Sequence, residues 1–486
     1  MPEEAAHEHS SSKGLFEGTI FEGGLSGKEK HEEHEEHASE FERLKHETKI
    51  GYFIFEWMAE WGVSRALCLW IVFLGLLLIL GYEIPNFVGF TLAWLAGTAP
   101  VWVLVSLLIS DYYVWIWYAQ GLYISGRDPV LLEIKVPREI SKSPRAMELV
   151  LVSLYNTSSE TTFLHRIWRG QMRCWYSFEY ASFGGEVHMY VWVWKTYQRV
   201  VEAAFYAQYP EIEIRPVEDY AMKFRYDPSK HSAFVNEERY TETDALPIRT
   251  YIDFELDKDP KEEYRVEPLA QMFEYLSSLK KGEQVWAQII FRASGKYGSE
   301  LNPKRGDREW AERVRKEVEK IRKKSSLNSE GKEGFPRPTW MQTEQIRAME
   351  RQLNKIPFDV AIRALYIADT TQTPYGGAGY GNMRWLFKAV NGENKFFNQI
   401  KPTGWHNTLD YPWQDFLGIR DRLMTRRFID GYRRRDAFFA PWYLEYRVMT
   451  NEVIATLFHP PSSSVKAPGL ERIPATKSEP PPNLPK

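Results

Sequence analysis

The chain has 486 residues, 44% of them hydrophobic, which is long enough for at least two folded domains with sizeable cores. Its formal net charge of −3 is too close to zero for a protein that coats nucleic acid. Only two cysteines are present, Cys68 in an apolar run and Cys174 in a strand-like segment, so a disulfide framework is excluded and a reducing compartment suits both.

Residues 1–50 form an acidic, His-rich tail with few apolar side chains, and we expect it to be disordered. Within it, HEEHEEH places His31, His34 and His37 three residues apart. On a helix these side chains would share one face, which is a candidate metal-binding stripe. A solvated polar tract is the simpler interpretation, because exposed histidines without supporting hydrogen bonds bind metals weakly.

Two apolar runs follow within residues 51–125, at 66–82 and 87–110, with a Glu-Ile-Pro-Asn corner between them. Their lengths match the roughly 17–25 residues that a spanning helix needs, so they predict a two-helix transmembrane hairpin. A buried hairpin in a large core is the alternative. Lys and Arg flank the pair on both outer sides and are missing from the corner, which places both termini in the cytoplasm. We therefore expect a multi-pass protein of the bacterial inner (cell) membrane.

Residues 128–225 predict the order β-α-β-β-α-β. A strand at 131–136 precedes a helix at 143–156, two strands flank the turn at Gly184 and Gly185, and a helix at 197–209 leads to a strand at 211–217. This order is typical of a ferredoxin-like unit.

The pattern recurs in residues 248–400, with strands expected at 251–256, 283–293 and 357–368 and helices at 268–279 and 381–390. A charged helical insertion at 306–356 interrupts this second α/β unit. Each of its two helices has one narrow apolar seam, which predicts an antiparallel hairpin that either binds a partner or is an elaborated crossover. The expected fold class is α+β: a two-helix transmembrane hairpin followed by a duplicated ferredoxin-like (βαββαβ) cytosolic region with a helical insertion.

Motifs that carry chemistry are missing. No Gly-Lys pair has the glycine spacing of a P-loop, and no H-E-x-x-H, C-x-x-C or G-x-S-x-G occurs. The Gly-rich stretch 374–382 leads into a predicted helix whose N-terminus could bind an anion, but a flexible loop is the preferred interpretation. We expect no catalytic residue, no cofactor and no resident metal.

A basic and aromatic segment occupies residues 401–460, and a Pro-rich tail follows at 461–486. Arginines interleaved with aromatic rings suit nucleic-acid backbones and stacked bases, acidic lipid head groups, ordinary ion pairs between domains or a protein partner. The candidate contact residues are Arg420, Arg422, Arg426, Arg427, Arg433, Arg434 and Arg435.

The segments LLEIKVPREISKSPRAMELVLVSLY, SFEY, AFYAQYPEIEI and NEVIATLFHPP together give a family resemblance. From about residue 128 to its end, the chain resembles the membrane-anchored N-terminal region of bacterial type IV secretion or conjugative DNA-transfer ATPases of the HerA/FtsK-like class. In that family a Pro-rich connector similar to PPPNLPK leads into a P-loop motor, whereas this sequence ends there. The resemblance implies that the motor is a separate chain.

The expected function is therefore a non-catalytic, membrane-anchored scaffold or adaptor of such a system, which tethers a separate P-loop ATPase at the inner membrane and raises its effective concentration. The sequence leaves open whether the chain forms an oligomer. The alternative is a membrane-tethered DNA-binding element that guides DNA to a translocation pore. An independent enzyme ranks last, because no nucleophile or metal set is recognisable.

Overall fold

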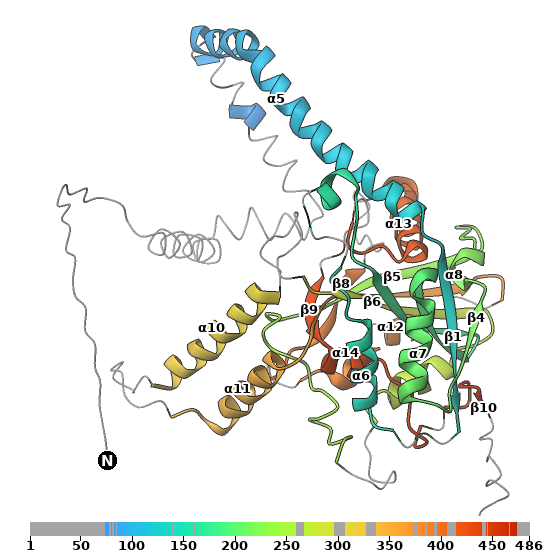
Figure 1. The fold of residues 1–486 in the computed structure, drawn as a ribbon. Helices are drawn as coiled ribbons and strands as arrows, with labels where there is room; N and C mark the ends of the chain where they lie inside the picture. The colour runs from blue at the N-terminus through green and yellow to red at the C-terminus, as the bar shows by residue number, and fades with distance from the viewer. Residues whose placement is uncertain are drawn as a thin grey trace, which may run out of the picture. The chain divides into compact units, whose positions relative to one another are not determined.

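The computed structural model describes residues 73–473 (Figure 1). Its gaps are 77–78, 80–81, 84, 139, 141, 159–161, 163, 259–266, 296–306, 327–336, 373–377, 384–385, 393–395, 406–414, 440–443, 445 and 466. The predicted tail at 1–50, with His31, His34 and His37, lies outside the described residues, as does 474–486 of the Pro-rich tail. The chain divides into two compact units, Met1–Trp94 and Leu95–Lys486.

The predicted transmembrane hairpin is not seen. Helix α5, Pro85–Ser125, contains the second apolar run, whereas most of the first run lies outside the described residues. No single helix in the described part of the chain is long and apolar enough to cross a membrane; only the consecutive segments Gly89–Val101 and Val103–Ser125 reach that length and hydropathy together, bent by 52°. Pro100 lies beside this bend and explains it, because proline removes a helical hydrogen bond and clashes with the preceding turn. The expected fold class and the expected multi-pass inner-membrane location are therefore wrong.

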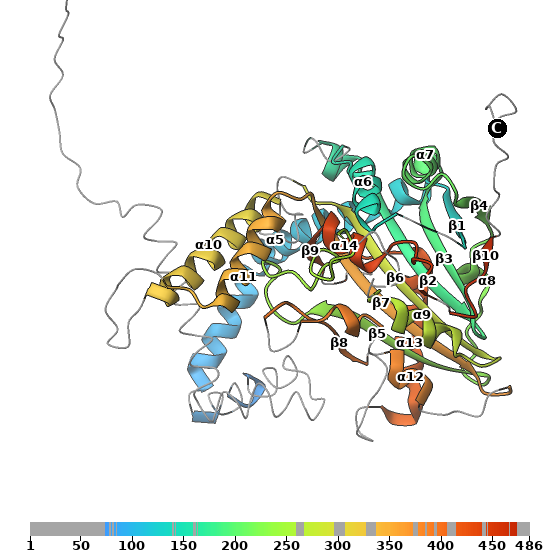
Figure 2. The same cartoon turned by 90° about the horizontal axis from the view of Figure 1, so that it is seen from below.

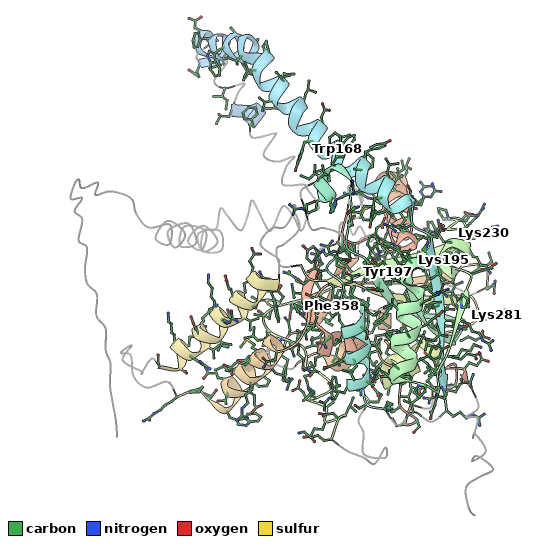
Figure 3. The ribbon with its side chains drawn as sticks, in the orientation of Figure 1. Trp168, Lys195, Tyr197, Lys230, Lys281 and Phe358 are labelled. Carbon is green, nitrogen blue, oxygen red and sulfur yellow. The ribbon has the colours of Figure 1, made fainter. Side chains whose placement is uncertain are left out.

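The C-terminal part of α5 packs against the segment that follows α6. Trp115 Nε1 donates to the Ile167 carbonyl at 3.1 Å, and the Trp115 and Trp168 rings lie 5.0 Å apart. Figure 3 shows Trp168 next to α5. Gly170 allows this close approach: its φ is +59°, and a Cβ there would lie 2.2 Å from the Ala119 backbone.

The described strands form one ten-stranded sheet in the order β10-β1-β3-β2-β6-β7-β5-β8, with β4 paired to β1 and β9 to β7. All pairings are antiparallel except that of β1 with β10. The strands are β1 Pro129–Pro137, β2 Trp175–Phe183, β3 Glu186–Trp194, β4 Glu213–Val217, β5 His231–Tyr240, β6 Glu283–Ala293, β7 Pro357–Asp369, β8 Ile400–Trp405, β9 Arg447–Thr450 and β10 Arg472–Ile473.

The sheet has two halves with matching strand order. The first runs β4-β1-β3-β2 and the second runs β8-β5-β7-β6, so each half places its first strand between its fourth and its third. They join where β2 pairs with β6, from Trp175 opposite Arg292 to Phe183 opposite Gln284. Glu179 lies opposite Gln288 at the middle of this β2–β6 seam. Both halves therefore share one continuous sheet.

One face of the sheet carries the main apolar core, because alternate side chains of a strand point to the same side. Phe178 on β2 packs on Phe205 of α7 and stacks on Phe458 at 4.4 Å. Figure 2 shows α6 and α7 on this side of the sheet and α13 on the other. The helices in contact with this core are α6 Arg145–Leu154, α7 Gln198–Gln208, α9 Ala270–Ser277 and α14 Asn451–Leu457.

The opposite face is unusually polar and is covered by α8, Tyr220–Lys223, by α13, Ile419–Arg434, and by the residues after α13. Glu179, the neighbour of Phe178 on β2, contacts Arg435 on this side, and Gln288 Nε2 donates to the Tyr432 carbonyl at 2.9 Å. The arginine-rich part of the segment predicted as basic and aromatic therefore covers a sheet face.

The predicted helical insertion is a packed hairpin of α10, Asp307–Ser326, and α11, Trp340–Leu353, which lie side by side in Figures 1 and 2. Val314, Val318 and Met349 from the predicted seams are buried in a second, smaller core. The hairpin also has an ion pair between Arg322 and Glu350, 2.7 Å long. The seam prediction is confirmed.

Two local predictions in the second half are wrong. Residues 251–256 are a run of turns instead of a strand. The first strand of this half is β5, which pairs with β7 and β8 and which sequence reasoning missed. The helix expected at 381–390 is a short α12, Ala378–Met383, and a separate 3-10 turn, Lys388–Val390. Other short turns are Leu164–Trp168, Lys195–Tyr197 and Phe416–Gly418.

Candidate functional site

The seven candidate arginines lie along α13 and its C-terminal end, and the structure separates them into two groups. The side chains that remain on the surface are Arg420, Arg422, Arg426, Arg427 and Arg434. Arg433 is half-buried and Arg435 is fully buried. A basic stretch that looks uniform in sequence therefore has an exposed part and a structural part.

Helical periodicity explains the division. Thr425, Ile429 and Tyr432 face the sheet and are buried, so residues on the far side of α13 face outward. Arg420, Arg427 and Arg434, spaced seven residues apart, fall on that outward side. After α13 the chain adopts a left-handed conformation at Arg435, with φ of 53°, which ends the helix.

Arg435 is held between two carboxylates beneath α13. Its Nε lies 2.9 Å from Glu179 Oε1 and its Nη2 lies 3.0 Å from Asp219 Oδ1. Burial lowers the pKa of Arg435, but attraction by Glu179 and Asp219 outweighs this and raises the pKa well above its ordinary value. Tyr220 adds an O–H donor to Glu179 at 2.6 Å. Arg435 is therefore a structural cation that a ligand would not reach.

A second buried arginine, Arg363 on β7, ties α13 to the β2–β6 seam. Its Nε donates to Gln288 Oε1 and its Nη2 to the Gly431 carbonyl, both at 2.8 Å. Gln288 Nε2 in turn donates to Glu179 Oε1 at 3.1 Å. Burial lowers the pKa of Arg363 to about 10. Sequence reasoning missed this residue, because one arginine in an otherwise apolar strand gives no distinct signal.

Beside Arg435 lies a cavity of about 450 Å³, here called the tryptophan cavity. It is bounded by the end of α5, the strands β1, β2 and β3, and the residues after α13. Trp175 lies 4.9 Å from Trp194 in an edge-to-face arrangement and 6.1 Å from Trp192 in a stacked one. The other lining residues are Gly121, Ile124, Ser125, Arg127, Pro129, Asp219, Met222, Arg433, Arg434, Asp436 and Phe439.

The rim of the tryptophan cavity is basic. The guanidinium of Arg127 lies 4.6 Å from the centre of the Tyr123 ring and 5.6 Å from that of Trp194. Arg433 Nε donates to the Ala221 carbonyl at 3.0 Å, which fixes its position against α8. Arg434 is exposed and forms a 3.1 Å ion pair with Asp430 one turn earlier. Three cations therefore surround an aromatic interior.

Asp436 lines the same cavity, although its side chain is only 2% exposed. Within the described part of the chain, its carboxyl group forms no hydrogen bond or ion pair. Burial raises the pKa of Asp436 to about 8, and the attraction of Arg363 and Arg434 offsets this only in part. A buried acid without a partner is the unusual chemical feature of this site.

Two other buried or half-buried charged side chains have partners within the fold. His459 Nε2 lies 3.0 Å from Glu267 Oε1, and its Nδ1 lies 2.8 Å from the Ala455 carbonyl. Arg351 pairs with Asp253 at 3.0 Å. The described residues contain no group of His, Cys, Asp or Glu that could hold a metal ion. The Gly-rich stretch 374–382 lies partly outside the described residues.

No protein-family model matches this chain, and the search among curated proteins found no similar sequence.

Proposed function

We propose that this chain is a scaffold of a type IV secretion-like or conjugative DNA-transfer-like system and that it holds a separately encoded P-loop motor ATPase. The proposal concerns the binding of a partner protein alone. The observation that supports it most directly is the surface of α5. The large apolar side chains exposed between residues 95 and 122 are Leu95, Val101, Val103, Leu104, Val105, Leu107, Tyr112, Val114, Trp115, Trp117, Tyr118 and Leu122.

Such a surface favours contact with another macromolecule, because soluble proteins rarely expose contiguous apolar patches of this extent. Consecutive residues of a helix point about 100° apart, so Val103, Leu104 and Val105 face different directions. A partner would therefore have to enclose α5 on more than one side. The sequence resemblance implies that this partner is the P-loop motor.

The sheet suits a scaffold because it is continuous across the β2–β6 seam. Arg363, Gln288 and Glu179 also connect that seam to α13 by buried hydrogen bonds. A partner held at one element is thus fixed relative to the other elements of the sheet. A shared scaffold raises the effective concentration of its partners without any chemistry of its own.

The test is binding between the full chain and a HerA/FtsK-like P-loop ATPase from the same genome, measured by calorimetry. The double substitution Leu104→Gln and Leu107→Gln places two amides on one side of α5 and should weaken binding by about tenfold or more, since each buried leucine contributes roughly 1.5–3 kcal/mol. Leu149→Gln, at an exposed leucine of α6, is the matched control and should leave affinity unchanged.

Two outcomes would reject the scaffold proposal. One is equal affinity of the double variant and the native chain for the ATPase. The other is ATP hydrolysis by the purified chain alone. Circular dichroism of the double variant shows whether α5 remains helical.

A second candidate function, a DNA-binding element, is favoured by one specific observation. Arg420 and Arg427 lie on the outward side of α13 about 10 Å apart along its axis, with Arg434 a similar distance further on. Cations in a row can follow a phosphate backbone.

This candidate predicts salt-sensitive binding of a single-stranded oligonucleotide, measured by fluorescence anisotropy. Substituting both Arg420 and Arg427 by Gln should reduce the slope of log affinity against log salt by about 1.4, at roughly 0.7 per lost phosphate contact. Arg347→Gln, at an exposed arginine of α11, is the control. An unchanged slope would reject a role of α13 in binding DNA.

A further inference from the structure

The tryptophan cavity combines three chemical properties that one ligand would have to satisfy. Its walls are aromatic, from Trp175, Trp192 and Trp194. Its interior contains the carboxyl group of Asp436. Its rim is cationic. Its volume of about 450 Å³ lies within the range of small-molecule sites, roughly 300–1,000 Å³.

Asp436 is the observation that points to a ligand. Burying a polar group without a hydrogen bond costs free energy, so native proteins rarely do it. The cations nearest to Asp436 already have partners: Arg363 donates to Gln288 and to a backbone carbonyl, and Arg434 pairs with Asp430. A donor brought by a ligand would supply the hydrogen bonds that the fold does not.

The cationic rim narrows the class of ligand. An amine would suit the aromatic walls and Asp436, but Arg127, Arg433 and Arg434 would repel it. A purely apolar molecule would leave Asp436 without a partner. The three properties together require a flat aromatic ring with N–H donors and an attached anion.

We propose that the tryptophan cavity binds a nucleoside phosphate, with the base against the tryptophan wall, its N–H edge on Asp436 and its phosphate at Arg434. Guanine fits best, because its ring N–H and its amino group lie side by side and match the two oxygens of a carboxylate. Uracil has no amino group and should bind less tightly. The nucleotide comes either from the free pool or from a single-stranded nucleic acid.

This site lies at the C-terminal ends of α5 and α13. The docking variant changes Leu104 and Leu107, the DNA variant changes Arg420 and Arg427, and none of these four residues lines the cavity. The cavity therefore does not depend on either proposed function. A failure of ATPase binding, or an unchanged salt slope in the variant that lacks Arg420 and Arg427, leaves the nucleotide proposal standing.

The experiment uses the full chain with GMP and UMP at pH 8.5, followed by calorimetry and by tryptophan fluorescence, which a stacked base quenches. GMP should bind about tenfold or more tightly than UMP, and Asp436→Asn should remove this preference, as expected for a lost bidentate contact. Glu344→Gln, at a distant, partly exposed acid on α11, should leave it unchanged. Affinity for GMP should be higher at pH 8.5 than at pH 6.5, because Asp436 accepts hydrogen bonds best as a carboxylate.

A second variant tests the rim without disturbing a buried residue. Arg434→Gln should weaken the binding of GMP several-fold and leave the binding of guanosine, which has no phosphate, unaffected. Guanine-containing single-stranded oligonucleotides form the last arm: binding of the oligonucleotide but not of GMP assigns the site to a strand. The proposal is overturned if neither GMP nor the oligonucleotide binds at about 1 mM, if Asp436→Asn retains the preference for GMP over UMP, or if Arg434→Gln weakens guanosine as much as GMP.

Discussion

Glu179 and Arg435 form a fully buried ion pair at the centre of the molecule. Two hydrogen bonds join them, 2.9 Å from Nε to Oε1 and 3.0 Å from Nη2 to Oε2, and both side chains are 0% exposed. The pair links β2, at the middle of the β2–β6 seam, to the residue that ends α13. It thereby connects the segment that sequence reasoning chose for binding to the structural centre of the sheet.

Replacing Arg435 by methionine should cost about 3–5 kcal/mol of unfolding free energy, because Glu179 would be left charged and buried without its partner. Urea denaturation followed by tryptophan fluorescence measures this. Arg434→Met, at the exposed neighbouring position, should cost less than about 1 kcal/mol. Equal losses of unfolding free energy in the two variants would show that the buried ion pair contributes no more to stability than an exposed one.

Acid should destabilise the fold through Glu267. Burial raises the pKa of Glu267, but the neighbouring His459 outweighs burial, so the pKa lies below its ordinary value of 4.5. The folded state therefore binds this proton less readily than the unfolded state. The resulting stability is present above pH 4.5 and is lost as the pH falls through the lower folded value.

Denaturation of Glu267→Gln between pH 6 and pH 3 should accordingly show a shallower loss of stability than the native chain. Glu471→Gln, which removes a carboxylate exposed beside Lys135, serves as the control. The same acid dependence in Glu267→Gln and the native chain would exclude this pair as the cause.

Asp436 should have the opposite effect on the pH dependence of stability, because it stabilises the fold at low pH instead of at high pH. Its pKa is raised from 3.8 to about 8, so the folded state holds this proton more tightly than the unfolded state. Its contribution is greatest below pH 3.8 and is lost as the pH rises through about 8. Asp436→Asn removes this dependence and should melt at a higher temperature than the native chain at pH 9. A lower melting temperature of the variant at that pH would contradict the absence of a partner.

Gly170→Ala should loosen the attachment of α5 to the segment around Ile167. The left-handed backbone alone costs about 1–2 kcal/mol with a Cβ, and the added carbon would collide with the Ala119 backbone. Hydrogen exchange of the Trp115 indole N–H reports whether its bond to Ile167 persists. Gly97→Ala is the matched control, since a Cβ there meets nothing within 4 Å and should stabilise the helix by about 1 kcal/mol. Slow exchange in Gly170→Ala, as in the native chain, would contradict the prediction.

The sequence predicted those elements whose pattern is local. β6 and β7 are apolar runs bounded by charged or turn residues, and they lie where they were expected. The seams of α10 and α11 follow helical spacing, which needs no knowledge of the rest of the chain. By contrast, β5 contains Asn236, Glu237, Glu238 and Arg239 in succession, so its strand character comes from pairing with β7 and is invisible in its own composition.

The prediction of a transmembrane hairpin was wrong because it used the length and hydropathy of each apolar run, and these do not show where a helix bends. The bend beside Pro100 interrupts the second run. The candidate arginines stay a prediction as contact residues, but the structure places them differently. Arg434 lines the tryptophan cavity, whereas Arg435 is buried and forms hydrogen bonds with Glu179 and Asp219. Asp436 follows the arginine run directly and was overlooked, because only the fold shows that its carboxyl group faces a cavity without a partner.

The β2–β6 seam limits how this protein can be divided. A fragment that ends near residue 225 would contain β4, β1, β3 and β2 but would leave the backbone amides and carbonyls of β2 without β6. An unpaired strand edge recruits other chains, and the fragment would also lack Phe273 of α9 and Phe458, which pack on Tyr180 and Phe178 of β2, so it should aggregate. Any product of partial translation or proteolysis that is cut between β2 and β6 should aggregate in the same way, and selection should therefore preserve the two halves as a single polypeptide.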